Sequence, residues 1–400
     1  MRKTGDLKLI QELNQHIILD VIRKYGPISR SEIAKKTKLS PTTVASAVSE
    51  MIEEGIVIDA EAGQSSGGRP PILVRFVPDS KFLIGVSITN STVAIASMNL
   101  EAEVKKKHVY SIDFYNERDF IGCILKIIEE YISKIQDLSK CIGISIITPG
   151  IVDSERGIIR HNSRLKLFNI PLKDIVEERF GLKTWLDNDA NAIALAEKQF
   201  GFYRNSKNLI YIQLGEGLGS GIVVNNTIFR GNQGGAGEFG HISIDTEGTR
   251  CECGNIGCLE NYVRWPVIYS RILSFIESGK KSVMLEMAGG NKKNISQQVF
   301  LSALEAGDEL AKMIAEETAS YLASGLVTLV NLFNPEAILI GWEALYYDSS
   351  LIFKIRNKVK EHAFQLFTNE LEIQSTTLGK EFQLMGAAAV LLQDIFDFSL

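Results

Sequence analysis

The sequence lacks a long uninterrupted apolar run and a segment built like a signal peptide. A membrane-spanning helix needs roughly 18 or more consecutive apolar residues, and no stretch of this chain meets that requirement. The N-terminal stretch MRKTGDLKLIQEL places charged residues between the apolar ones, so it has no signal-peptide core. These absences argue against a membrane-spanning or exported protein, and we expect a cytoplasmic one.

The chain also lacks a strong excess of charge of one sign. Its net charge of −5 at pH 7 does not indicate a nucleic-acid-binding protein as a whole. The charges are unevenly distributed, however, because residues 1–80 contain 11 Lys and Arg against 10 Asp and Glu, whereas the remainder contains 32 against 38. A slightly basic N-terminal region on an acidic body is compatible with a small DNA-reading module attached to a larger domain.

Cysteine is scarce, with five residues in the chain. Cys123 and Cys141 lie among apolar residues, and we expect them to be small core residues. The other three, Cys251, Cys253 and Cys258, fall within eight positions. An odd, clustered set in a chain expected to be intracellular favours a metal site over disulfide bonds.

Glycines in the spacing C-x-C-G-x-x-G-C let the chain turn around the clustered cysteines. Three thiolates together with the imidazole of His241, ten residues before the first cysteine, would form a closed tetrahedral site for Zn²⁺. Because such a site leaves no open coordination position, its role would be structural. Spacing alone does not establish His241 as the fourth ligand, and three free thiols in a loop are the alternative.

The first 78 residues have the pattern of a winged helix-turn-helix. Residues 7–25 carry apolar positions at helical spacing, and Gly26-Pro27 ends that helix. A short second helix starts at Ser29, and a third starts at Ser40-Pro41 and runs to Gly55. Two β-like runs, IVIDAEA and ILVRFVP, then flank a loop rich in glycine, serine and proline.

In a helix-turn-helix, the start of the second helix of the pair contacts base edges in the major groove. The corresponding side chains here are Ser40, Thr42, Thr43 and Ser46. Arg69, in the loop GGRPP between the two strands, can enter a minor groove from the tip of the wing. These five residues are the predicted DNA contacts. The alternative is a helical module that binds another protein.

From about residue 82 onward, strands and helices alternate, which predicts an α/β fold with covered sheets. The final third is expected to be mostly helical around one apolar strand, EAILIG. Both halves of this region open with strand-rich segments, so a duplicated lobe is possible in principle, but the sequence alone does not demonstrate one.

Three stretches resemble the ROK family, which groups bacterial repressors with sugar kinases. They are LDNDANAIALAE, YIQLGEGLGSGIVVNNTIFRGNQGGAGEFGHISID and CECGNIGCLE, and the similarity extends over nearly the whole chain, including the N-terminal winged helix of the repressor branch. The resemblance implies a two-lobed actin-like, hexokinase-like ATPase fold after the winged helix. We expect the first lobe over 79–190 plus 386–400, and the second lobe, with the zinc site, over 191–385.

The family's sugar-binding residues are matched at five positions. The resemblance implies that the following side chains bind sugar hydroxyls: Asn188, Asp189, Glu238, His241 and Glu260. Carboxylates, amides and imidazoles are suited to a ring of hydroxyls because they accept and donate hydrogen bonds in fixed pairs. By the same resemblance, His241 is also a zinc ligand. As isolated residues, acidic side chains are usually solvated surface charge.

The chain departs from the family's kinases at three nucleotide-binding segments. The first phosphate loop is replaced by Ser87-Ile88-Thr89-Asn90-Ser91, which has neither the aspartate nor the glycines of a kinase. The second reads Gly215-Glu216-Gly217 and places a carboxylate where phosphate would lie. The third reads Gly341-Trp342-Glu343, with a bulky indole in place of a glycine.

Together these features predict a non-catalytic, sugar-responsive transcriptional repressor of carbohydrate-utilisation genes. Its partners would be operator DNA, a small sugar effector and further copies of itself in a homodimer or homotetramer. Xylose, glucose and acetylated amino sugars all remain candidate effectors. The alternatives are an active kinase that phosphorylates a hexose with ATP, a regulator controlled by a protein instead of a sugar, and a zinc-stabilised scaffold without DNA binding.

Overall fold

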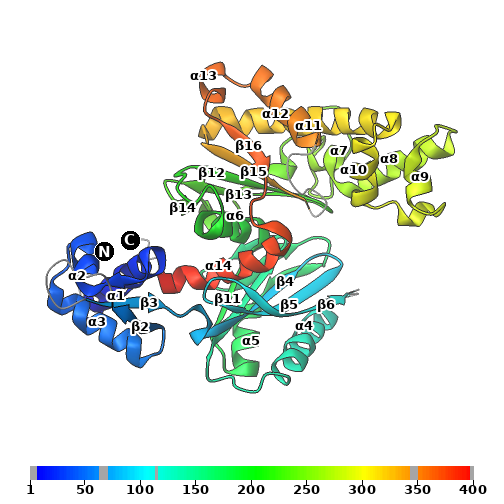
Figure 1. The fold of residues 1–400 in the computed structure, drawn as a ribbon. Coiled ribbons are helices and arrows are strands. Elements are labelled where there is room, and N and C mark those ends of the chain that lie inside the picture. The colour runs from blue at the N-terminus through cyan, green and yellow to red at the C-terminus, as the bar shows by residue number, and fades with distance from the viewer. Residues whose placement is uncertain (1–6, 63–70, 113–115, 343–349, 397–400) are drawn as a thin grey trace.

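The computed structural model describes residues 7–62, 71–112, 116–342 and 350–396 (Figure 1). The N-terminal region contains the three helices and the hairpin that the sequence predicts, and a further short strand extends the hairpin to a sheet of order β1-β3-β2. Its elements are α1 (Leu7–Tyr25), β1 (Ile28–Ser29), α2 (Arg30–Thr37), α3 (Pro41–Glu53), β2 (Val57–Ala62) and β3 (Ile72–Phe76). We refer to this unit as the head.

Local capping explains where the head's short helices begin. The Ser29 hydroxyl accepts a hydrogen bond from the Glu32 amide, and the Glu32 carboxylate accepts one from the Ser29 amide, which completes a capping box. Ser40 caps α3 in the same way, by accepting from the Thr43 amide, with Pro41 at the first helical position. The inner face of α3 is buried against α1, α2 and β2, through Val44, Ala47, Val48 and Met51.

Behind the head lies a five-stranded sheet of order β11-β7-β4-β5-β6. Strands β4, β7 and β11 are parallel, and β5 and β6 extend the sheet antiparallel from β4. Its strands are β4 (Phe82–Ile88), β5 (Thr92–Asn99), β6 (Val104–Ser111), β7 (Cys141–Thr148) and β11 (Thr184–Asn188). One face packs on α4 (Glu117–Ile132) and α5 (Leu172–Phe180), through the core to which Ile84 and Val86 belong.

The second large sheet repeats this topology, with the order β16-β15-β12-β13-β14. Strands β12, β15 and β16 are parallel, and β13 and β14 extend the sheet antiparallel from β12. Its strands are β12 (Leu209–Leu214), β13 (Leu218–Val224), β14 (Thr227–Ile228), β15 (Ala337–Gly341) and β16 (Glu372–Ser375). The duplicated lobe that the sequence left open is therefore present.

A large helical layer covers one face of the second sheet (Figure 1). It comprises α7 (Glu260–Val263), α8 (Trp265–Glu277), α9 (Val283–Met287), α10 (Gln297–Glu305), α11 (Glu309–Phe333), α12 (Ser350–His362) and α13 (Gln365–Thr368). The expectation of a single strand in this final third is wrong, because β16 also belongs to the sheet. The sequence EIQS of β16 is short, and three of its four residues are polar, so it carries little of the apolar pattern of a buried strand.

Three further strands form a small sheet of order β10-β9-β8 beside the first lobe. They are β8 (Ile151–Asp153), β9 (Ile158–Asn162) and β10 (Leu167–Ile170). The loop after β9 carries Ser163 and Arg164 into the space between the two large sheets.

Two helices connect the parts of the molecule. Helix α6 (Asp189–Phe200) follows β11, and α14 (Phe382–Phe396) packs against it and then continues to the head (Figure 1). The buried core of the head is continuous with α14 through Leu384, Leu391 and Phe396. Within the described ranges, no helix combines the length and the apolar character that crossing a bilayer requires.

Candidate functional site

A cavity of about 550 Å³ lies between the two large sheets, and both lobes contribute to its lining. The first lobe contributes the turn after β4 and the loops after β7 and β9, and the second contributes the turn between β12 and β13. All five residues that the family resemblance assigned to a sugar line this cavity: Asn188, Asp189, Glu238, His241 and Glu260. The fold thus brings together side chains that lie up to 72 positions apart in the sequence.

The junction between β11 and α6 fixes the first two of these residues. Asn188 is the N-cap of α6: its Oδ1 accepts from the Asn191 amide at 3.0 Å, and its Nδ2 donates to the Gly150 carbonyl at 3.0 Å. Asp189 begins the helix and accepts from the Ala190 amide at 2.9 Å. Asp189 lines the cleft. Burial raises the pKa of its carboxyl group to about 6, with the negative charges of Glu238 and Asp187 adding to the effect.

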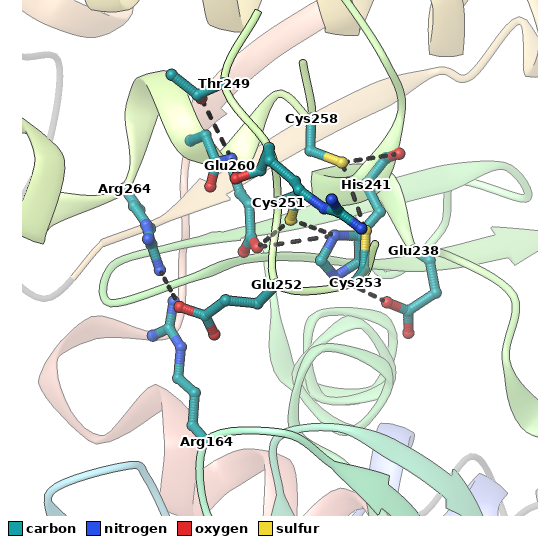
Figure 2. Close-up of polar contacts among 12 residues, drawn as sticks. Arg164, Glu238, His241, Thr249, Cys251, Glu252, Cys253, Cys258, Glu260 and Arg264 are labelled. Atoms are coloured by element: carbon teal, nitrogen blue, oxygen red, sulfur yellow. Dashed lines mark hydrogen bonds and ion pairs between the residues drawn. The ribbon is translucent and has the colours of Figure 1, made fainter. Parts of the chain in front are cut away.

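The other three sugar-site candidates form a row from the cleft to the cysteine cluster (Figure 2). The Glu238 Oε2 atom lies 3.8 Å from the Nε2 of His241, and the Glu260 Oε1 atom lies 3.7 Å from its Nδ1. Burial raises the pKa of Glu238, which His241 partly offsets. His241 therefore presents one ring nitrogen to the cleft-side carboxylate and the other to the cysteine side.

The cysteine cluster assembles as its spacing predicted, and it includes His241. The ligand atoms of His241, Cys251, Cys253 and Cys258 all lie within 4.8 Å of one another. The Sγ atoms of Cys253 and Cys258 are 3.6 Å apart, and the Sγ of Cys251 is 3.6 Å from the Nδ1 of His241. Ligands at tetrahedral Zn–S distances would be separated by about 3.8 Å, so the four donors fit a tetrahedral metal ion.

The chemistry of these donors also fits a cation. Burial, followed by the neighbouring thiols, raises the pKa of Cys258 to about 12, because several thiolates cannot ionise side by side without a compensating positive charge. The turn around the cluster requires glycine at position 257, where φ is +68° and a Cβ would lie 1.7 Å from the Asp245 carbonyl oxygen. The cluster is thus a site compatible with a structural metal ion.

Of the three segments that depart from the kinases, the first two line the cleft and the described residues of the third do not. Thr89, Asn90 and Ser91 line the cavity next to Glu216. The Glu216 carboxylate lies 3.5 Å from the Ser91 hydroxyl, and its backbone carbonyl accepts from the Arg164 guanidinium. Contacts of Glu216 therefore join the two lobes.

Trp342 follows β15 and is fully buried. Its ring lies 6.5 Å from those of Trp265 in α8 and Phe300 in α10, in an aromatic cluster between the second sheet and its helical layer. Glu343, the other residue singled out at this segment, lies outside the described residues.

Sequence reasoning missed several polar residues of the cleft. Arg164, His161 and Glu252 all line it. Arg164 and His161 lie in the loop after β9 and in β9 itself, outside the family's motifs, and Glu252 lies inside the cysteine motif but had no role assigned to it. Asp187 forms a bidentate ion pair with Arg230, with both N–O distances at 2.7 Å, which ties β11 to the loop before Glu238.

The predicted DNA contacts occupy a separate place, at the start of α3. Ser40, Thr42 and Ser46 are exposed, and Thr43 is half-buried. The Ser40 hydroxyl lies 2.9 Å from that of Thr42 and 2.8 Å from that of Thr43, so part of this set serves the cap. Arg69 lies outside the described residues.

Comparison with known families matches two parts of the chain. The ROK family model matches residues 83–394, and a model described as winged helix-turn-helix DNA-binding matches residues 12–58. The chain is 32% identical over 396 residues to the xylose repressor of Caldicellulosiruptor bescii, covering 98% of this chain and 99% of the relative. It is 30% identical over 376 residues to the transcriptional dual regulator NagC of Escherichia coli, covering 94% and 91%.

Two solved structures show where the architecture recurs. A ROK family transcriptional regulator, described as a homologue of the Escherichia coli MLC protein, superposes with a TM-score of 0.83 at 28% identity over 97% of both chains. A ROK family glucokinase from Streptomyces griseus, in complex with glucose and AMPPNP, superposes with a TM-score of 0.65 at 27% identity. It covers 77% of this chain and 98% of the glucokinase. The structure of the transcriptional regulator thus matches nearly the whole chain, whereas the glucokinase matches about three quarters of it.

Proposed function

This chain belongs to the ROK family, and from that premise we propose that it is a sugar-responsive, DNA-binding transcriptional repressor of carbohydrate-utilisation genes. The observation that carries the proposal is the combination of a winged helix-turn-helix with a polar cleft in which the family's sugar-binding residues converge. The relatives named as xylose repressor and as NagC, which match nearly the whole chain, support the same assignment.

The proposed sugar site consists of Asn188, Asp189, Glu238, His241 and Glu260. Asn188 is held in place by its cap on α6 and its bond to Gly150, so its carboxamide is pre-oriented. The ionised carboxylates accept hydrogen bonds from ring hydroxyls, and the Nε2 of His241 faces the same side of the cleft as Glu238.

We propose that the metal ion is Zn²⁺, held by His241, Cys251, Cys253 and Cys258. Three thiolates and one imidazole are a donor set that suits structural zinc. When bound, the ion neutralises the thiolates and fixes the loop that carries His241 at one end and Glu260 at the other. The chain's own residues then present Glu238 and Glu260 to the sugar from a rigid frame.

We further propose that the chain does not transfer phosphate. Glu216 places negative charge at one kinase phosphate loop, and the side chains at Thr89 and Asn90 occupy the other, where a phosphate needs bare backbone amides. Trp342 fills space beneath the second sheet with a buried indole. Asp189, which is the proton acceptor in the family's kinases, accepts from a sugar hydroxyl here.

The route from the cleft to the head runs through two packed helices. Asn188 and Asp189 start α6, which packs along α14, and the end of α14 reaches the head. There the ring of Phe396 lies 6.0 Å from that of Phe76, edge to face. The Arg23 guanidinium lies over the Phe396 ring, 4.5 Å from its centroid. Lobe closure around a sugar would therefore move the head with α14 and alter the spacing of two heads in a dimer.

In this mechanism Ser40, Thr42, Thr43, Ser46 and Arg69 contact the operator. The repressor is a homodimer or homotetramer, because a helix-turn-helix protein usually reads two half-sites. We place the head at 1–78, the first lobe at 79–190 with 386–400, and the second lobe at 191–385. The protein acts in the cytoplasm.

An operator gel-shift with a panel of pentoses and hexoses tests the proposal. We expect the chain to shift DNA from its own promoter region and at least one sugar to change that shift. The Thr43→Ala and Arg69→Ala double variant should lose operator binding but keep its sugar affinity. If no sugar changes the shift and none binds in calorimetry, the sugar response is refuted and control by a protein partner is favoured.

A coupled assay with ATP and the same sugars tests the kinase alternative. We expect no turnover from the purified chain. Phosphate transfer from ATP to any of these sugars would refute the non-catalytic assignment.

A further inference from the structure

A second, smaller hollow of about 30 Å³ adjoins the sugar cleft behind Asn188. Gly150, Asn188, Gly219 and Glu238 line both spaces, so the hollow is a side pocket of the cleft. A space of this size holds one or two non-hydrogen atoms, such as a single hydroxyl or amino group. It is too small for an acetamido or a phosphate group.

Asn191 lines this hollow from the first turn of α6. Its side chain is 97% buried, and its Oδ1 accepts no hydrogen bond from the residues that the structure describes. A buried amide oxygen without a donor is unusual in a folded protein, because the lost hydration is not replaced. The position of this oxygen beside a ligand cleft indicates that its donor comes from outside the chain.

Two other polar side chains of the hollow, Ser220 and Glu238, can also accept hydrogen bonds. The Ser220 hydroxyl donates to the Gly237 carbonyl at 2.8 Å, so its hydrogen is already engaged and its lone pairs remain available. The Glu238 carboxylate, which lines the same space, accepts hydrogen bonds when it is ionised. A guest that carries an N–H or O–H therefore satisfies the Asn191 oxygen, and a group without either leaves it unpaired.

We infer that Asn191 is a specificity-determining residue. Together with Ser220, its side-chain oxygen accepts a hydrogen bond from one small substituent of the sugar. This substituent is a hydroxyl or a primary amine, attached directly to the ring or to its exocyclic carbon. The inference rests on the proposed sugar site and adds a selection rule to it. One position of the sugar must carry a donor no larger than a single non-hydrogen atom. Sugars that are acylated, phosphorylated or methylated at that position are rejected by size.

The test begins with calorimetric titration of the full chain with D-glucose and D-xylose. The four monodeoxyfluoro derivatives of glucose, with fluorine at carbon 2, 3, 4 or 6, are then titrated in the same way. If only xylose binds, its derivatives with fluorine at carbon 2, 3 or 4 are used instead. Fluorine is nearly the size of a hydroxyl but has no hydrogen to donate. We expect one fluorinated position to weaken binding about tenfold to a hundredfold, because it leaves the buried oxygen unpaired. That position then identifies the group that enters the hollow.

The Asn191→Ala variant is titrated with the same series. We expect it to bind the parent sugar more weakly and to lose the penalty at that one position, to within about twofold, while the other positions keep theirs. Ser220→Ala should reduce the penalty at the same position, so the inference remains testable if one variant is poorly folded. Ser91→Ala, at the opposite side of the cleft, is the matched control and should leave the pattern unchanged.

Two outcomes overturn the inference, and they differ in what they mean for the proposed function. A sugar that binds with the same fluorine pattern in the wild type and in Asn191→Ala refutes the role of Asn191 and leaves the sugar site intact. A wild-type chain that binds no pentose or hexose of the gel-shift panel, D-glucose and D-xylose included, refutes the proposed sugar site and the inference that rests on it.

Discussion

At the scale of single residues, Asp189 combines an ionisable group with an environment that resists its ionisation. Burial at the start of α6 raises its pKa from 3.8 to about 6. Between these two values the native state binds more protons than the unfolded chain, so stability falls as the pH rises, and the full penalty is present above about pH 6. Ionisation of Asp189 therefore lowers the free energy of unfolding at neutral pH, while it leaves a hydrogen-bond acceptor in the cleft.

Replacing Asp189 with asparagine should remove this cost. We expect Asp189→Asn to raise the free energy of unfolding at pH 7 by up to about 3 kcal/mol, with a difference near zero at pH 4. Urea titrations at the two pH values measure it, and Glu178→Gln, an exposed change in the same lobe, is the control. An equal effect of Asp189→Asn at both pH values would contradict the assignment.

Trp342 is a buried aromatic residue whose contribution to packing can be measured. Its indole is 1% exposed and contacts the rings of Trp265 and Phe300. We expect Trp342→Ala to destabilise the chain by about 3–5 kcal/mol and Trp342→Phe by clearly less, because the smaller change leaves less cavity. Chemical denaturation compares the three proteins, and equal stability of Trp342→Ala and the wild type would show that the indole is not part of the core.

At the scale of elements, the sequence predicts best what is decided locally. The starts of α2 and α3 were predictable because Ser29 and Ser40 cap the helix that follows them, within three residues. The residues on the buried face of α3 followed from their helical spacing in the same way. The metal cluster also followed from close spacing, since its three cysteines lie in one turn.

What the sequence could not predict depends on contacts between distant segments. The polar strand β16 is recognisable only from its pairing with β15. Arg164 enters the cleft because the loop after β9 passes over it, and nothing in NSRLKL indicates that path. The sugar-site set itself came from the family's motifs, because single acidic residues at positions 189, 238 and 260 have no spacing that links them.

The loop that carries the metal cluster should behave as one element that folds around its ion. We expect about one zinc ion per chain by elemental analysis, and chelation should lower the thermal midpoint and weaken sugar binding, because Glu260 and His241 lose their frame. Operator binding by the head should persist at low temperature, since the head lies apart from this loop. Cys253→Ser is the matching variant, and undiminished sugar affinity in a zinc-free chain would contradict this dependence.

At the scale of the whole molecule, one helix, α14, contacts both the first lobe and the head. Its inner side shares the core of the head, and its other contacts lie on α6 and on strands β4 and β7. Such packing offers a path by which a change at the cleft would reach the head.

Truncation of Phe396 tests this coupling. We expect Phe396→Ala to keep the affinity for sugar and for operator to within a few fold, but to reduce the effect of sugar on operator binding by about 0.5–2 kcal/mol. Gel-shift titrations with and without sugar give the coupling free energy, and Phe202→Ala, which truncates an 81% exposed ring elsewhere, is the control. An unchanged sugar effect in Phe396→Ala would show that the signal takes another route.

The position of α14 along the chain has a consequence for biosynthesis. The head is translated before α14, the last helix described, yet α14 completes one side of the head's core, where Phe396 meets Phe76. A chain that terminates before α14 would therefore leave this side of the head without its apolar partner and would be prone to proteolysis, instead of persisting as a DNA-binding fragment that ignores sugar. The architecture thereby favours operator occupancy by chains that carry the complete sensor.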